Sequence, residues 1–407
     1  MELTGCSINK TLTNVHCNKV GVFENPKSRN NLNKLKMSDY STFKTSYAEV
    51  KDQDLKKLVD HITSMMQLSV QQAVHGRISK NPVKFKKLEV GGTKKVKISS
   101  VAEVVDGYLA KKTIAELNGF ARHSGPKTIL SQNRFGIETF KDVKITDTKS
   151  VFEQITPKTT FNYINDKLLF NIGTIYGVQN GATSPSSTAN MSVAPTSNHP
   201  QAVALRLNLR KVKCLDETNP EWPGSDSIAV GGVAVDDKQV RSVITEFSAG
   251  SFNDGTVKNY SPIKVLKSFP LDSINPSTFM AFVTLAEKDG AGFSSFLHDL
   301  YEAVKGEVQS ILNSLGAAAG KAIGTAIGGA IGTSIAGPLG TIIGIVAGFL
   351  LGALIDWIVG AFKDDIFEPI ITGVILNNNS PFTGPVETLT YQDFGGKYTA
   401  EVFWSAS

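Results

Sequence analysis

Apolar residues recur at helical spacing in three parts of the chain, and each part is expected to form an amphipathic helix. These parts are Tyr47–His75, Ser100–Phe120 and Phe293–Leu315. The second opens with Ser100 and Glu103, which have the spacing of a capping box. Charged residues of the first part fall largely outside its apolar stripe, as expected for a helix with one face in the core.

Alternation of apolar and polar residues predicts strands elsewhere. The segment Val83–Ile98 alternates on both sides of Gly91 and Gly92, which indicates a short β-hairpin. Most of the remaining alternation follows the uncharged, Ser/Thr/Asn/Pro-rich stretch 179–201, which indicates a linker there. The strands predicted after it are Ala202–Cys214, Ile228–Val235, Val240–Phe247, Phe279–Leu285, Val386–Tyr391 and Lys397–Trp404. Together they predict a β-sandwich.

The most unusual stretch is Leu312–Phe362. It has no charged residue between Ala322 and Ile355, a run longer than the ~20 residues that one membrane crossing needs. Glycine recurs at every fourth position, which gives a smooth stripe on one helix face and favours close helix pairing in lipid. Proline interrupts the run and predicts a turn. The glycine-zipper hairpin expected from this pattern comprises Gly316, Gly320, Gly324, Gly328, Gly332, Gly337, Pro338, Gly340, Gly344, Gly348 and Gly352.

Two interpretations of this stretch stay open. Glycine is unfavourable inside a helix in water, by about 0.5–1 kcal/mol relative to alanine, whereas lipid enforces the helix. This favours a membrane-active hairpin. Alternatively, the same glycines allow tight packing in the centre of a soluble protein, and the hairpin has a purely structural role.

We therefore predict an α+β chain in which a mixed, mainly helical N-terminal domain precedes a C-terminal β-sandwich that carries an inserted, long apolar helical hairpin. The expected divisions are a flexible extension (1–46), a basic, mainly helical domain with a lysine-rich β-hairpin (47–178), a linker (179–201), the first part of the sandwich (202–290), an amphipathic helix with the apolar hairpin (291–370) and the completing strands (371–407).

Charge adds a candidate lipid-binding surface. The 407 residues carry a formal net charge of +5, but the basic excess lies in the first 150 residues and the rest of the chain is acidic overall. Lysines cluster in the predicted β-hairpin, where each would contribute about 1 kcal/mol near an anionic membrane. Nucleic acid is not an expected partner, because aromatic residues do not alternate with these lysines. The anionic-lipid candidates are Lys84, Lys86, Lys87, Lys94, Lys95 and Lys97.

No pattern predicts an enzyme: the six histidines are scattered, and no HExxH, GxSxG or phosphate-loop motif occurs. The three cysteines lack CxxC spacing, which gives no support for a disulfide framework or a zinc site. No cofactor is therefore expected, apart from one weak candidate. Asp216, Glu217 and Asp226 lie around a turn between two predicted strands, and Ca²⁺ favours several carboxylate oxygens on flexible loops. A solvated acidic loop explains the same residues.

Acidic residues near the end of the apolar stretch suggest a pH switch. Asp356 lies inside the stretch, and Asp364, Asp365 and Glu368 follow it. A charged carboxylate in lipid costs about 2.5–3.5 kcal/mol, and protonation removes this cost. The hypothesis is that acidification favours insertion. The alternative is that these acids keep the end of the hairpin in water.

A soluble composition, a basic helical N-terminal part and a glycine-zipper hairpin together resemble pore-forming bacterial toxins. Residues 312–362 are similar in type to the hydrophobic hairpins of colicin-like pore formers. The size from Met37 onward and the absence of a recognisable signal peptide also resemble small insecticidal toxins of insect-pathogenic bacteria. The resemblance implies a virulence protein, secreted or released without a signal peptide, that permeabilises a target-cell membrane.

The partners implied are target membrane lipids, a cell-surface receptor and further copies of the chain in the inserted state. Three other functions stay open. The hairpin could translocate an N-terminal effector domain, anchor a resident membrane protein, or be a structural element with no pore activity.

Overall fold

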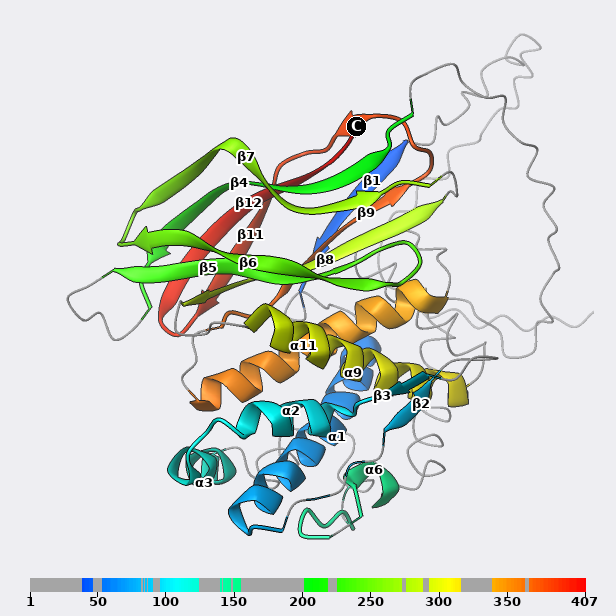
Figure 1. Cartoon of the computed structure of the whole chain (residues 1–407), viewed down its shortest axis with the longest axis vertical. Coiled ribbons are helices and arrows are strands. Elements are labelled where there is room, and N and C mark those ends of the chain that lie inside the picture. Colours follow the sequence, from blue (N-terminus) through cyan, green and yellow to red (C-terminus); the bar gives the residue numbers. More distant parts are fainter. Residues whose placement is uncertain are drawn as a thin grey trace, which may run out of the picture. The chain divides into compact units, whose positions relative to one another are not determined.

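The computed structural model describes residues 39–46, 53–81, 83, 85, 87–90, 96–123, 140, 142–147, 149–154, 201–218, 225–272, 276–287, 293–315, 339–362 and 366–407. By its contacts, Ser38–Ser407 forms one compact unit. Within this unit two antiparallel β-sheets and a group of helices lie in successive layers, from top to bottom in Figure 1.

The inner sheet lies between the other sheet and the helices. Its order is β1 (Tyr40–Thr45), β9 (Ile370–Leu376), β8 (Ser277–Glu287), β5 (Asp226–Val235) and β6 (Arg241–Phe252), and every neighbouring pair is antiparallel. Strand β8 is buried along almost its whole length.

The outer sheet contains β10 (Phe382–Thr383), β12 (Gly396–Ala406), β4 (Ala204–Asp216) and β7 (Val257–Pro270) in this order, and β11 (Glu387–Asp393) also pairs with β12. Strand β12 alternates regularly between buried and less buried positions, and β4 does so on either side of a register shift between Leu209 and Lys211. Their buried side chains, such as Leu207 and Trp404, face the inner sheet and form the core between the two sheets.

The helices lie on the other side of the inner sheet, with α9 and α11 next to it (Figure 1). They are α1 (Gln53–Ile78), α2 (Val101–Leu109), α3 (Ile114–His123), α6 (Val151–Gln154), α9 (Phe293–Leu315) and α11 (Leu339–Phe362). Helix α9 packs on β5 and β6, and α11 packs on α9 and α1. A separate two-stranded pair, β2 (Leu88–Val90) with β3 (Val96–Ile98), lies at the segment where the sequence predicts the lysine-rich hairpin.

Because successive residues of a strand point to opposite faces, β8 contributes to two cores. Phe279 and Val283 enter the core between the sheets. Met280 and Phe282 enter the core beneath the helices. The inner sheet is therefore an apolar layer that needs a cover on both sides, and α9 and α11 supply one of them.

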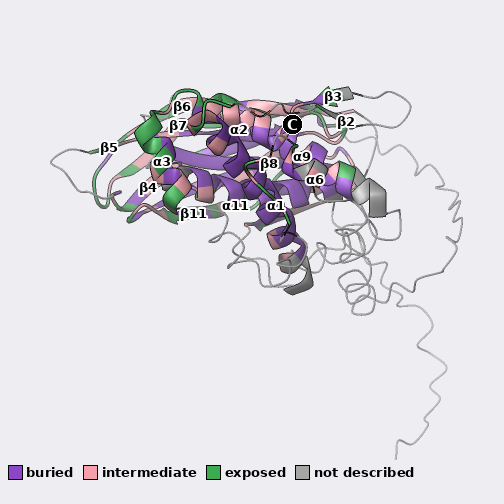
Figure 2. Cartoon of the chain, turned by 90° about the horizontal axis from the view of Figure 1, so that it is seen from below, coloured by how far each residue is buried: buried purple, intermediate pink, exposed green. Residues whose placement is uncertain are grey.

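The predicted fold class is wrong about the apolar stretch. Strands hold more of the described residues than helices do, and in this part of the chain no apolar helical hairpin is inserted into the sandwich. Helix α11, the described part of the expected hairpin, is instead one of the packed helices of the core. Figure 2 shows this helix as largely buried. The physical reason is that an apolar glycine-bearing helix fits against an apolar sheet as well as against lipid.

Two local differences also have clear causes. The single helix expected over Ser100–Phe120 is divided into α2 and α3, because Thr113 and Glu116 form a second capping box: Thr113 N donates to Glu116 Oε2 at 2.7 Å, and Glu116 N donates to Thr113 Oγ1 at 3.3 Å. The capping predicted at Ser100 is present, since its Oγ accepts from Glu103 N at 3.2 Å. Residues 40–45 form β1, although they lie in the expected flexible extension.

The packing of α11 on the inner sheet gives a stability prediction. A methyl group added at Gly348 would clash with the ring of Phe282 and lie 2.8 Å from Cδ1 of Ile371. Overpacking of this kind costs about 1–3 kcal/mol, so Gly348→Ala should lower the free energy of unfolding. Chemical denaturation measures the change.

Gly107 on α2 is the matched control, because nothing lies within 4 Å of a methyl group added there. Gly107→Ala should raise the free energy of unfolding by about 0.5–1 kcal/mol, the usual advantage of alanine in a helix. Equal effects of the two substitutions would contradict the packing described for α11.

Candidate functional site: a buried helix and its polar neighbours

Helix α11 is made mostly of apolar residues and is covered on several sides. Its one charged residue is Asp356. Side chains around its circumference are fully buried, among them Ile345, Val346, Leu350, Leu354 and Ile355. A helix that is apolar all round is normally found in the interior of a protein or in a membrane.

The glycine stripe of α11 faces the inner sheet and α9. A methyl group added at Gly344 would lie 2.8 Å from Cε of Met280 and 3.3 Å from the hydroxyl of Tyr301. Gly348 meets Phe282, and Gly352 lies against the side chain of Glu368. These glycines therefore let neighbouring side chains approach the helix backbone.

The other predicted zipper residues are only partly placed. Gly340 belongs to α11, but nothing more is described of its surroundings. The first glycine stripe and the turn lie outside the described residues: Gly316, Gly320, Gly324, Gly328, Gly332, Gly337 and Pro338.

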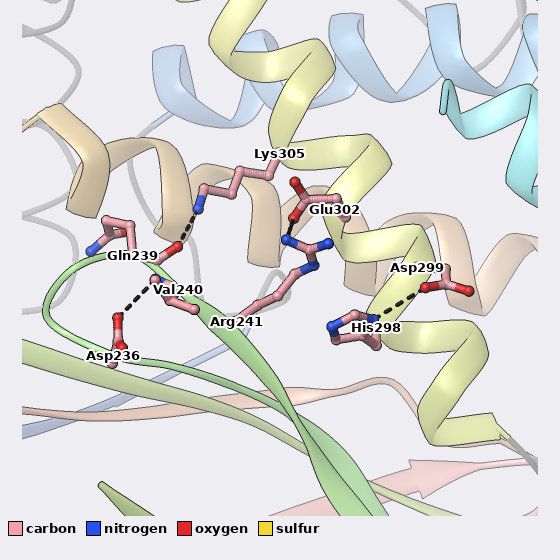
Figure 3. A network of polar contacts seen from close by, with 8 residues as sticks. All are labelled: Asp236, Gln239, Val240, Arg241, His298, Asp299, Glu302 and Lys305. Atoms are coloured by element: carbon pink, nitrogen blue, oxygen red, sulfur yellow. Dashed lines mark hydrogen bonds and ion pairs between the residues drawn. The ribbon is translucent and has the colours of Figure 1, made fainter. Parts of the chain in front are cut away.

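A polar network joins the β5–β6 turn to α9 beside α11 (Figure 3). In the turn, Val240 N donates to Asp236 Oδ1 at 2.7 Å. Lys305 Nζ of α9 donates to the carbonyl oxygen of Gln239 at 2.7 Å. Arg241, at the start of β6, forms an ion pair with Glu302 of α9. The network holds α9 against the sheet, and α9 in turn covers α11.

Several polar atoms in this region are buried without a hydrogen-bond partner among the described residues. They include both side-chain atoms of the Gln239 amide and the hydroxyl of Tyr301. An unsatisfied buried polar group costs about 1–3 kcal/mol. Gln239 also has a φ of 63°, an uncommon value for a residue other than glycine. Burial, and then the Glu302 carboxylate, raise the pKa of Tyr301.

Glu307 of α9 is the most deeply buried carboxyl group in this part of the structure. Its Oε1 accepts from Val101 N at 2.9 Å, at the start of α2. Its Oε2 has no hydrogen-bond partner among the described residues. Burial raises its pKa to about 8, while the hydrogen bond from Val101 acts in the opposite direction.

The pKa of His61 on α1 is shifted in the opposite direction, downward. Its ring stacks with Phe140 at 5.0 Å between centroids, and the residue is almost fully buried. Burial lowers its pKa to about 4, so its neutral form is the one that fits the core.

The predicted pH-switch acids are not gathered into one buried group. Asp356 is exposed, yet desolvation by the surrounding protein and then the nearby Asp393 carboxylate raise its pKa. Glu368 is half-buried beside Gly352. Asp364 and Asp365 lie outside the described residues.

Sequence reasoning missed Glu307 and His61. The sequence signal that could have found Glu307 is its position on the apolar stripe of α9, beside Val304, Val308 and Ile311.

Only some of the residues predicted to contact lipid lie in the described part of the chain, whereas all three predicted metal ligands do. Lys87 and Lys97 are exposed at the β2–β3 pair, whereas Lys84, Lys86, Lys94 and Lys95 lie outside the described residues. Asp226 is buried, and its Oδ2 accepts from Thr218 N at 2.7 Å and from the hydroxyl of Tyr398.

The other two metal candidates, Asp216 and Glu217, lie at the end of β4 and just after it, and the backbone N of Glu217 donates to Asp254. Across the described parts of the chain, no group of three or more His, Cys, Asp or Glu side chains could hold a metal ion.

The chain matches no family model, and comparison with curated proteins and with solved structures finds no match either. Within the described helices, none combines the length and apolarity that a membrane crossing requires.

Burial of Glu307 predicts a pH dependence of stability. Its folded pKa of about 8 lies above its unfolded value of 4.5, so the folded state retains a proton that the unfolded state loses. The free energy of unfolding should therefore fall as the pH rises between these values, by as much as a few kcal/mol, since each pKa unit corresponds to about 1.4 kcal/mol.

Glu307→Gln keeps an oxygen that can accept from Val101 but cannot ionise. The variant should lose much less stability than the unmodified chain between about pH 6 and about pH 9, as measured by urea denaturation. Asp142→Asn, at an exposed position, is the control and should follow the unmodified chain. Parallel pH curves for Glu307→Gln and the unmodified chain would contradict the assignment.

Proposed function

We propose that the protein permeabilises a target membrane, and that α11 is the segment whose apolar surface moves from the protein core to the lipid acyl chains. The supporting observation is the nature of α11, a helix with one charged residue that is kept covered by α1, α9 and the inner sheet. Transfer from the core into lipid would keep its apolar side chains away from water.

The surroundings of α11 suggest how its cover could be removed. Besides its apolar packing on the sheet, α9 makes polar contacts that water can replace, those of Lys305 with Gln239 and of Arg241 with Glu302. Unsatisfied buried atoms at Gln239, Tyr301 and Glu307 raise the free energy of the closed state. Parting α9 from the β5–β6 turn would hydrate the unsatisfied atoms of Gln239 and Tyr301 and uncover α11.

Two buried groups, His61 and Glu307, make the stability of the folded protein depend on pH in opposite directions. His61 carries a depressed pKa, so it contributes stability above about 6.5 that is lost as the pH falls toward about 4. Glu307 has the opposite effect, because the stability that its protonated form contributes to the fold is lost as the pH rises toward about 8. The proposal includes release in acid, to which His61 and Asp356 contribute. It also includes the expected receptor, an oligomeric inserted state and a location at a target-cell membrane.

A second candidate is a structural role for α11 without membrane activity. It is favoured by the close fit of Gly348 to Phe282 and of Gly352 to Glu368. If these contacts serve only to close the core, α11 should never leave it while the protein is folded.

Trp357 allows the two candidates to be separated. It lies on α11, half-buried, with its ring edge-on to Phe120 at 4.9 Å between centroids. The experiment adds the folded protein to anionic vesicles at about pH 5 and about pH 7.5, and records dye release together with fluorescence quenching by brominated acyl chains. We expect dye release, stronger in acid, and quenching that Trp357→Phe removes.

Trp404, fully buried in the core between the two sheets, is the internal control, because its fluorescence in Trp357→Phe should not be quenched by the acyl chains. Dye release with unchanged quenching in Trp357→Phe would show that another segment enters the lipid. Neither release nor quenching at either pH, from protein that is folded, would contradict permeabilisation and leave the structural role.

A further inference from the structure

A cleft of about 760 Å³ lies between α2, α9 and β3, apart from the α11 core. Its volume falls in the range usual for small-molecule sites. Side chains from one face of α2 line one wall, and side chains from α9 line another. Both ends of the cleft contain charged groups.

Two contacts orient the helices that form the cleft. Tyr108 near the end of α2 stacks on Phe296 near the start of α9, at 4.7 Å between ring centroids. Val101 at the start of α2 contacts Glu307 further along α9. The helices therefore run antiparallel, and Glu103 and Glu302 lie toward the same end of the cleft, where Arg241 pairs with Glu302.

Unsatisfied atoms at that end indicate which chemistry a ligand would supply. Oε2 of Glu103 is buried and has no hydrogen-bond partner among the described residues, so it requires an N–H or O–H donor. Nε of Arg241 is likewise buried without a partner there and requires an acceptor. Lys97 of β3, which is exposed, also lines the cleft and supplies a second positive charge.

We propose that the cleft binds a compact zwitterion that carries a primary ammonium and a phosphate a few atoms apart, the chemistry of a phosphoethanolamine group. The ammonium donates to Glu103, and the phosphate oxygens accept from Nε of Arg241 and from Lys97. Phosphate suits this position better than a carboxylate, because it offers more acceptor oxygens and more negative charge to two cations.

A quaternary ammonium fits less well for two reasons. It has no N–H to satisfy Glu103. It would also favour open aromatic faces, but the Tyr108 ring already stacks on Phe296 and has Lys112 Nζ 5.1 Å from its centroid. Phosphocholine is therefore the discriminating comparison ligand.

The proposal does not depend on membrane permeabilisation, since a soluble ligand tests it. Titration calorimetry of the full chain with phosphoethanolamine should show binding. Phosphocholine and ethyl phosphate should bind about tenfold more weakly or less, because neither has an N–H or hydroxyl donor at the end remote from the phosphate and each leaves the buried carboxylate oxygen unpaired.

Glu103→Gln and Lys97→Met should each weaken phosphoethanolamine binding, the former by about tenfold or more. Asp216→Asn, at an exposed end of β4, is the charge-matched control and should bind as the unmodified chain does. Thermal melting of each variant confirms that it is folded, so that a loss of binding reports on the cleft.

Vesicle flotation separates the two sources of this chemistry. Capture by phosphatidylethanolamine vesicles but not phosphatidylcholine vesicles, lost in Glu103→Gln, would assign the ligand to a lipid headgroup. Binding of soluble phosphoethanolamine without capture would assign it to a free molecule. Equal binding of phosphoethanolamine and phosphocholine, or unchanged binding in folded Glu103→Gln, would overturn the proposal.

Discussion

The rest of the structure depends on the double burial of strand β8. Along this strand Phe279 and Val283 belong to the core between the two sheets, whereas Met280 and Phe282 belong to the core beneath the helices. An inner sheet of this kind cannot leave either face in water without exposing a large apolar area. Helices α9 and α11 are therefore required by the sheet, and the apolar composition of α11 matches the surface that it covers.

Tight apolar contact and unsatisfied polar atoms occur side by side in this layer. Gly348 brings the backbone of α11 close to Phe282, which favours the closed state. Nearby, Gln239, Tyr301 and Glu307 each keep buried atoms without a hydrogen-bond partner among the described residues, which opposes it. Because the tight contact and the unsatisfied atoms act in opposite directions, the layer that covers α11 is a candidate for controlled opening. This links the packing of the helix to the proposed membrane activity.

Much of the fold could be predicted because its elements have clear local patterns. The apolar stripe of Phe293–Leu315 and the alternation along β4 and β12 correspond to a helix and two strands of the structure. Strand β9 was missed because it is nearly all apolar and lacks alternation. Strand β7 was missed because it contains Pro262, and several of its apolar residues are exposed.

The site was harder to predict because its partners are distant in sequence. A glycine at every fourth position indicates that something packs closely on one helix face, but it is compatible with lipid, another helix or a sheet. In the described half of the stripe, that partner comes from β8, β9, α9 and Glu368. The cleft beside α2 likewise depends on Arg241 and Glu103, which no sequence motif connects.

The central claim is that α11 is an integral part of the core when no membrane is present. Native-state hydrogen exchange, followed by mass spectrometry across residues 343–358, tests it most directly. In the absence of membranes, these amides should exchange only through global unfolding, as slowly as those of β8. Fast exchange of α11 while β8 stays protected would contradict the account, because the helix would then leave the sheet without unfolding the protein.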